Sequence, residues 1–330
     1  MLTFEDGADV PTFLPRDEGT HAPGDDRYWQ ESCLMLWGDL SSDCGGLLRV
    51  GHTPNLNGGE MTVWAYAFTP GWVYADDFDM PQGIDDRTTS GLSAGTAASY
   101  DFDGHNTIWR HAGKEVEFEL VAHDYYPPIS LWRTEEGNLA FPHSEAACRI
   151  TGQLRIRDEV SAIDGMGLRD HSWGVRHWGK GKVHRWFNAV FGPDLSMCLL
   201  TMLTTDTREI RRLGYVVRDG VVHYSSEVDI IVHMEPDGAT HRGGIGRIRL
   251  DNGEVLEFMA EPVAQGAYMS RHDRYLFQSL CRVRHKDRTG FGDFEITENA
   301  HAGVQPPSAL VNGIISKGVH FRRTPVTQYA

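Results

Sequence analysis

Runs of alternating apolar and polar residues are the feature that most constrains the fold of this chain. In KEVEFEL, the apolar residues Val116, Phe118 and Leu120 alternate with glutamates, and RITGQLRIR alternates in the same way. A period of two places one set of side chains on each face of an extended strand, so each run predicts a strand with one solvated face. Glycine-containing turn signals separate such runs, and YVVRDGVVHY is the clearest predicted hairpin.

Long amphipathic helical patterns are hard to find, and only the segments 93–100 and 208–212 could form short helices. Many short strands joined by glycine-rich turns are typical of β-sandwiches and closed barrels. A chain of 330 residues is long enough for two domains. We therefore predict an all-β protein of two tandem antiparallel barrels or curved sheets with few short helices, residues 1–160 and 161–330.

The charge, the N-terminal sequence and the cysteines indicate which partners and which cellular compartment to expect. The chain carries 31 basic and 46 acidic residues, so it should repel phosphate backbones and anionic lipid headgroups, and we expect neither nucleic acid nor a membrane as partner. The start MLTFEDGADV lacks the basic and apolar regions of a signal peptide. The five cysteines form no CxxC pair, which indicates reduced thiols. These features predict a cytoplasmic protein and leave homo-oligomerisation open.

The segment GMGLRDHSWGVRHWG, residues 165–179, concentrates acid, imidazole, guanidinium and indole groups. In an extended conformation its side chains alternate between two faces, with Asp170, Ser172, Arg176 and Trp178 on one face and His171, Trp173 and His177 on the other. A carboxyl group in an apolar cavity keeps its proton near neutral pH and can act as a general acid. Nearby Arg169, Arg176 and His177 would favour the carboxylate instead.

The aromatic residues of this region have two interpretations. The indoles of Trp173, Trp178 and Trp186 could line a cavity and stabilise a cation formed inside it. They could equally pack in an ordinary core, and Asp170 could form a structural ion pair with Arg169 or Arg176. The density of the cluster favours acid/base chemistry on an apolar molecule.

Further candidates for ligand contact lie outside this segment. They are His123 and Tyr125 in AHDYYPP, Trp64 and Tyr66 in WAYAF, and Glu295 in GFGDFEITEN. The mouths of β-barrels are where such residues meet ligands. The structural alternatives are a surface loop for the first pair, core packing for the second and an outward-facing glutamate for the third.

Motifs for cofactor binding are missing from the sequence. Glycine-rich phosphate loops and GxSxG elbows are not found, so we expect no cofactor. A two-histidine, one-carboxylate iron site could form from Asp170 and two of the three histidines His171, His177 and His184. Their spacing of six and seven residues is unspecific, so no metal ligands are assigned and a metal-dependent oxygenase is an alternative.

The central segment resembles a family signature. GLRDHSWGVRHW, with Gly167, Asp170, His171, Trp173 and Gly174, is similar to the glycine, Asp-His, Trp-Gly signature that opens the second domain of lipocalin-like (calycin) carotenoid 1,2-hydratases, kievitone hydratases and AttH-type proteins. The resemblance implies tandem lipocalin-like domains over nearly the whole chain. The family includes cofactor-free hydratases and, more distantly, cyclases and pericyclases.

The resemblance also implies a role for one residue. In the hydratases the aspartate of the signature is the proposed proton donor, which implies that role for Asp170. Leu168 and Ser172 stand where the hydratases lead us to expect tyrosine and asparagine, so the resemblance does not imply a carotenoid substrate.

The leading expectation is a cofactor-independent hydratase, cyclase or isomerase. It would act on a terpenoid, polyketide or prenylated aromatic compound in a pocket near the domain interface, with Asp170 transferring the proton and His171 or His177 orienting it. The expected substrate-binding residues are Arg169, Trp173, Arg176, Trp178, Trp186, His123, Tyr125, Trp64, Tyr66 and Glu295. The alternative from another class is a lipocalin-like protein that binds an apolar ligand without chemistry.

Overall fold

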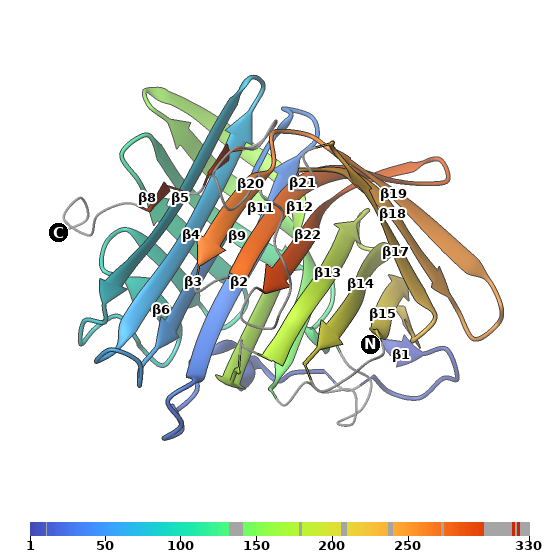
Figure 1. The fold of residues 1–330 in the computed structure, drawn as a ribbon, viewed down its shortest axis with the longest axis horizontal. Coiled ribbons are helices and arrows are strands. Elements are labelled where there is room, and N and C mark those ends of the chain that lie inside the picture. The colour runs from blue at the N-terminus through green and yellow to red at the C-terminus, as the bar shows by residue number, and fades with distance from the viewer. Residues whose placement is uncertain are drawn as a thin grey trace. The chain divides into compact units, whose positions relative to one another are not determined.

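The computed structural model describes residues 1–10, 12–131, 141–177, 180–205, 210–236, 240–271, 274–299, 319–320 and 322–323. Nearly all of their regular structure is extended, which confirms the all-β prediction (Figure 1). Segment 93–100 is not helical: it contributes to β6 (Gly91–Ala94) and β7 (Ala98–Phe102), with a turn between them. No helix in the described part of the chain is long and apolar enough to cross a membrane.

The chain forms two compact units. The N-terminal unit contains Pro11–Arg176 and Arg322–Ala330, and the C-terminal unit contains His177–Phe321 and Met1–Val10. Residue 160, near which the sequence placed a boundary, lies at the start of β12 (Glu159–Val175), which pairs with β11 (His143–Ile156). Because the hydrogen bonds of this hairpin hold both strands in one sheet, the Asp170 segment belongs to the N-terminal unit.

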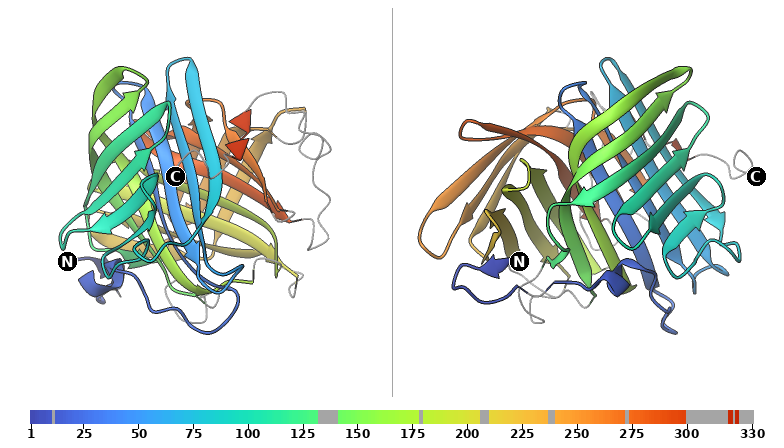
Figure 2. Two further views of the ribbon diagram at one scale, coloured as in Figure 1. Left: turned by 90° about the vertical axis from the view of Figure 1, so that its left-hand side faces the viewer. Right: turned by 180° about the vertical axis from the view of Figure 1, so that it is seen from behind.

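The N-terminal unit is a single 12-stranded sheet. Its hydrogen-bonded order runs through β24 (Arg322–Arg323), β5 (Trp72–Pro81), β4 (Glu60–Thr69), β3 (Cys44–Thr53), β2 (Trp29–Asp39), β12, β11, β9 (Val116–Asp124), β8 (Thr107–Ala112), β7 and β6, and β10 (Ile129–Ser130) adds to β11. The sheet curves strongly, since β6 lies against β3 and β4, and is nearly barrel-shaped (Figure 2).

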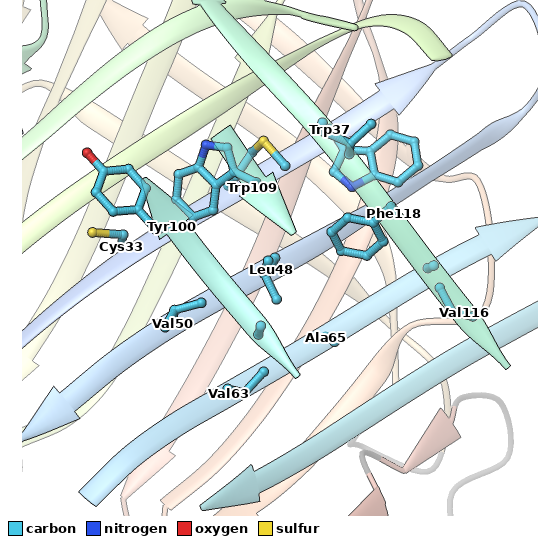
Figure 3. Packing of buried hydrophobic residues seen from close by; sticks show 14 of the residues in the cluster. Cys33, Trp37, Leu48, Val50, Val63, Ala65, Tyr100, Trp109, Val116 and Phe118 are labelled. Carbon is cyan, nitrogen blue, oxygen red and sulfur yellow. The ribbon is translucent and has the colours of Figure 1, made fainter. Parts of the chain in front are cut away.

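The interior of this curved sheet is filled by one face of each strand. Val116, Phe118 and Leu120 point inward, as the alternation in KEVEFEL predicts. The indole of Trp37 meets the Phe118 ring at 6.1 Å between ring centres, and Figure 3 shows the two side by side. The same inward row on β2 includes Cys33 and Met35, so the residues opposite them on β12 face inward as well.

The C-terminal unit is a second 12-stranded sheet, antiparallel except for the short strands β1 (Thr3–Phe4) and β23 (Val319–His320), which pair in parallel. Its main order is β1, β16 (Val221–Ser225), β15 (Arg211–Arg218), β14 (Leu195–Thr204), β13 (Gly181–Val190), β22 (Arg288–Asn299), β21 (Arg274–His285), β19 (Val255–Pro262), β18 (His241–Arg249) and β17 (Val228–Met234), with β20 (Ala267–Arg271) joining β21 to β23. Its core is built around Phe187, Phe258 and Phe294. All five cysteines of the chain are free and buried.

The hairpin predicted in YVVRDGVVHY forms between β15 and β16, with Arg218 opposite Val221. The two turn residues, Asp219 and Gly220, have φ values of 52° and 80°. Two successive positive φ angles match the twist of the flanking strands, which is why glycine or a short polar residue is favoured there.

Gly220→Ala should destabilise this turn. The left-handed region is strained for a residue with a Cβ, so we expect the free energy of unfolding of the C-terminal unit to fall by about 1 kcal/mol in urea denaturation. Asp219→Asn is the control, because asparagine tolerates the same region, and it should change the stability by less than half as much. Equal effects of the two substitutions would contradict this account of the turn.

Candidate functional site

β12 carries polar side chains to both faces of the N-terminal sheet. Asp170 lies opposite Glu145 of β11 and Leu34 of β2, whereas His171 lies opposite Ser144 and Cys33. Since directly opposed residues share a face, Asp170 points away from the core and His171 points into the unit. The predicted alternation is therefore present, and the His171 imidazole is directed away from the carboxyl group that it was expected to orient.

Asp170 is the most strongly perturbed carboxyl group on its face. It is 8% exposed, and burial raises its pKa to about 6, opposed by His143, Arg176 and Arg49 and reinforced by Glu145. Glu145 is fully buried, and its Oε1 lies 3.2 Å from Nε2 of His143. An acid with a pKa near 6 is populated in both forms near neutral pH, so it can donate or accept a proton.

The surroundings of Asp170 form what we call the acid face, defined by Glu145, Asp170, Leu34, Arg49 and Trp64. These residues lie side by side across β11, β12, β2, β3 and β4. The Arg49 guanidinium stacks over the Trp64 ring, 4.5 Å from its centre. The face thus combines carboxyl groups, a cation and an indole.

An apolar row adjoins the acid face one pleat further along the strands. It consists of Leu168, Leu36, Leu47 and Tyr66, all of them buried. Two of the predicted ligand-contact residues, Trp64 and Tyr66, therefore share the face of Asp170. This face of the sheet therefore carries a polar row and an apolar row side by side.

Arg176 lies on the Asp170 side of the segment. Its Nη2 donates to Oγ of Ser172, and its guanidinium lies 4.2 Å from the ring centre of Phe141. Gly174 has a φ of 117°, a conformation that disfavours other residues, and it allows the chain to turn before β12 ends. Arg176 is therefore held close enough to lower the pKa of Asp170 against the effect of burial.

Arg169, on the inner face, is enclosed by two carboxylates. Its Nη1 and Nη2 donate to Glu18 at 2.8 and 2.7 Å, and its Nε donates to Asp124 at 2.8 Å. Although burial raises it, the pKa of Glu18 is lowered because Arg169 stabilises the carboxylate, whereas burial dominates for Asp124 and raises its pKa. This occupied guanidinium forms a structural ion-pair network, on the face opposite Asp170.

Glu31 is the centre of a second inner network. Its carboxylate is fully buried and accepts from the backbone N–H of His21 at 3.0 Å. Its oxygens lie 2.7 Å from Nδ1 of His21, 3.0 Å from Nε2 of His171 and 3.3 Å from Nε2 of His52. Although burial opposes it, these three imidazoles hold the pKa of Glu31 far below its usual value. Trp173 stacks on the His21 ring with centres 3.6 Å apart.

The histidines considered for iron do not gather in the described part of the chain. Of His171, His177 and His184, only His171 belongs to a group there with metal-ligand spacing, together with His21 and Glu31. His184 contacts Glu295 in the C-terminal unit through its Nε2.

The other predicted residues have different surroundings. His123 is held between Asn106 and Thr151, at 2.9 and 3.0 Å, and Tyr125 is half-buried after β9, where burial raises its pKa. In the C-terminal unit, Trp186 is directly opposite Glu295, and its Nε1 donates to Sγ of Cys198. Trp178 lies outside the described residues.

Several site residues carried no signal in the sequence analysis. Glu145 and His143 stand two apart on β11, so their spacing in PHSEAAC could have placed them on one face of a strand. Glu18, Glu31 and His52 come from segments distant from β12, and nothing local marks them as its partners.

The fold of two large β-sheets is shared with AttH-type proteins of known structure. Similar solved structures include an AttH protein from Nitrosomonas europaea, with a TM-score of 0.67, 11% identity and coverage of 90% of this chain and 98% of that one. Kievitone hydratase from Nectria haematococca gives 0.61, 10%, 92% and 97%. CghA in complex with Sch210972 gives 0.61, 13%, 85% and 94%. They confirm the AttH-like resemblance at the level of the fold.

The chain belongs to the family described as Domain of unknown function (DUF7064), whose model matches residues 14–300. No curated protein matches the chain significantly.

Arg169→Met should destabilise the N-terminal unit by about 3–5 kcal/mol, because it leaves two inner carboxylates without their cation. Chemical denaturation followed by tryptophan fluorescence measures the loss. Arg149→Met is the matched control: Arg149 makes a similar two-bond pair with Asp164 on β12, but both side chains are more than half exposed, so the stability should hardly change. Similar losses in both variants would refute a special role of the buried pair.

Asp170→Asn should stabilise the folded protein at alkaline pH. The raised pKa means that the folded state favours protonated Asp170, so the contribution of this residue to wild-type stability is complete below about pH 4 and is lost as the pH rises through about 6. The amide has no charge to bury, and the variant should gain up to about 3 kcal/mol at pH 8 and nothing near pH 4. Urea denaturation at both pH values measures this difference. A gain that does not depend on pH would contradict it.

Proposed function

We propose that this protein is an enzyme that transfers a proton to or from an apolar small molecule, with Asp170 as the catalytic acid/base. The observation that carries the proposal is a buried carboxyl group with a pKa of about 6, directed away from the core beside an apolar row. A raised pKa keeps a fraction of the carboxyl group protonated near neutral pH, which is what a general acid requires. The shared fold with kievitone hydratase and CghA supports a hydratase or cyclase type of reaction.

The charges around Asp170 support the donation of its proton. After donation the carboxylate lies near the cations Arg176 and Arg49, which stabilise the negative charge. Before donation, the neighbouring Glu145 and the burial of the site disfavour that charge. The surroundings of Asp170 therefore disfavour its ionisation before the reaction, and the two cations stabilise the Asp170 carboxylate that remains after the proton is donated.

The expected chemistry begins with protonation of an alkene. The π bond takes the proton of Asp170, which leaves a carbocation on the substrate, and an indole such as Trp64 can stabilise that cation through its π face. Capture of a water molecule then gives a hydrated product, capture by a nucleophile within the substrate gives a cyclised product, and loss of a different proton gives an isomer. In each case the proton that leaves returns to the Asp170 carboxylate, which restores the acid. The apolar row of Leu168, Leu36 and Tyr66 suits a terpenoid, polyketide or prenylated aromatic skeleton.

Incubation in D₂O tests all three outcomes with one readout. Purified protein is mixed with a panel of alkene-containing terpenoids, polyketides and prenylated phenols, and mass spectrometry detects a carbon-bound deuteron in the recovered compounds. Asp170→Asn should lower the rate by at least about 100-fold, the usual size of a general-acid contribution. The wild-type rate should fall as the pH rises above about 6, because the donor form is lost.

Asp164→Asn provides the matched control. Asp164 lies on the same strand and face as Asp170 but is exposed and paired with Arg149, so its amide variant should keep the full rate. Full turnover in folded Asp170→Asn would eliminate the acid/base role.

The second candidate is a binding protein for an apolar ligand, which the buried row of leucines and tyrosine favours. Native mass spectrometry of the purified protein distinguishes it from the enzyme. A bound organic molecule that wild type and Asp170→Asn retain equally, without turnover on prolonged incubation, would establish binding in place of catalysis.

A further inference from the structure

We propose that His21, Glu31 and His171 bind one divalent transition-metal ion on the inner face of the N-terminal sheet. These residues come from three separate segments: the stretch before β2, the start of β2 and the end of β12. They lie on the face opposite Asp170, so the proposal is independent of the proposed proton transfer.

The donor atoms have the spacing of a coordination shell. Oε1 of Glu31 lies 2.7 Å from Nδ1 of His21 and 3.0 Å from Nε2 of His171. The three residues offer one ligand atom each, all within 4.8 Å of one another. Donors placed about 2.0–2.2 Å from a zinc-like ion are separated by roughly 2.9–3.6 Å, so the two carboxylate-to-imidazole separations need to change little for an ion to bind. Two imidazoles and a carboxylate suit zinc, iron or cobalt.

The charge at Glu31 also favours a cation. Glu31 is fully buried, and among the described residues its ion-pair partners are the three imidazoles of His21, His52 and His171. A neutral imidazole brings no positive charge, and a buried imidazolium is costly. A bound divalent ion would supply the missing charge while the histidines stay neutral.

Neighbouring residues hold the ligands in place. His52 lies at Oε2, the other oxygen of Glu31, and so fixes the carboxylate without being a ligand itself. The Trp173 indole stacks flat on His21, with an angle of 8° between the rings. Without a bound ion Nε2 of His171 donates to the Glu31 carboxylate, so metal binding at Nε2 requires the ring proton to move to Nδ1, which has no hydrogen-bond partner in the described residues.

Solvent access is provided by one ligand. The His21 side chain is 22% exposed, whereas Glu31 and His171 are nearly inaccessible. Because the three protein ligands leave coordination positions unfilled, water can complete the shell from the His21 side. The ion would join the segment before β2 to the sheet and so stabilise the folded unit.

Cobalt titration of the chelator-treated, untagged protein tests the site. Wild type should bind one Co²⁺ per chain with visible d–d absorption typical of nitrogen and oxygen ligands, and Zn²⁺ should displace it. The melting temperature should rise with either ion, because the ion binds the folded unit. Wild-type protein that binds no Co²⁺, or whose melting temperature does not respond, would overturn the proposal.

The variants separate a built site from adventitious binding. His21→Gln, in a partly exposed segment that is expected to tolerate the change, should weaken Co²⁺ binding at least tenfold, and Glu31→Gln should do the same. His105→Gln removes an exposed imidazole of the same unit and should leave the affinity unchanged. Unaltered Co²⁺ binding in His21→Gln, or an equal loss of affinity in His105→Gln, would contradict the assignment even if Glu31→Gln fails to fold.

Discussion

The inner face of β12 depends on one interaction, the contact of the Arg169 guanidinium with Glu18 and Asp124. A buried arginine is tolerated only where its donors meet acceptors, and here two carboxylates from different segments meet them. Because successive residues of a strand face opposite ways, fixing Arg169 inward also fixes Asp170 outward. A shift of β12 by one residue would exchange the two and leave a guanidinium on the acid face.

The pKa values of the inner carboxyl groups of Glu18 and Glu31 and of the outer carboxyl group of Asp170 are shifted in opposite directions. Inside, Glu18 and Glu31 are surrounded by donors, and their pKa values are lowered although burial alone would raise them. Outside, burial outweighs the nearby cations and the pKa of Asp170 is raised. Arg169 and His171, the partners of these inner carboxylates, thus directly flank Asp170 on β12, and the thickness of the sheet separates the two environments.

The sequence predicts local features of this protein well and distant ones poorly. The alternation of apolar and polar residues in KEVEFEL predicts a strand, and the RDG turn predicts a hairpin. Both elements are present, because each signal depends only on neighbouring residues. The pairing of Asp170 with Glu145 was also within reach, since the two-residue connection between β11 and β12 determines which residues lie opposite each other.

The inner networks could not be anticipated in this way. Glu18, Glu31 and His52 meet β12 only after the sheet curves, and no spacing in the sequence encodes that meeting. The same reason explains why segment 93–100 was open to a helical interpretation: its strands are short, and the sheet that they extend supplies their stability. Trp64 and Tyr66 were assigned by residue type alone, and the register of β3 and β4 places them on the face of Asp170.

The position of Glu18 in the chain has a consequence for how the protein is made. Glu18 and its partner Arg169 are separated by 151 residues, so the first of them leaves the ribosome long before the second. During that interval the N-terminal stretch has no ion-pair partner there, and the strands from β2 to β11 must assemble around an unclosed end. Closure of such distant segments is slow compared with the formation of hairpins. The nascent chain therefore exposes the Glu18 carboxylate until β12 is synthesised, and this long strand completes a contact that the first residues of the unit began.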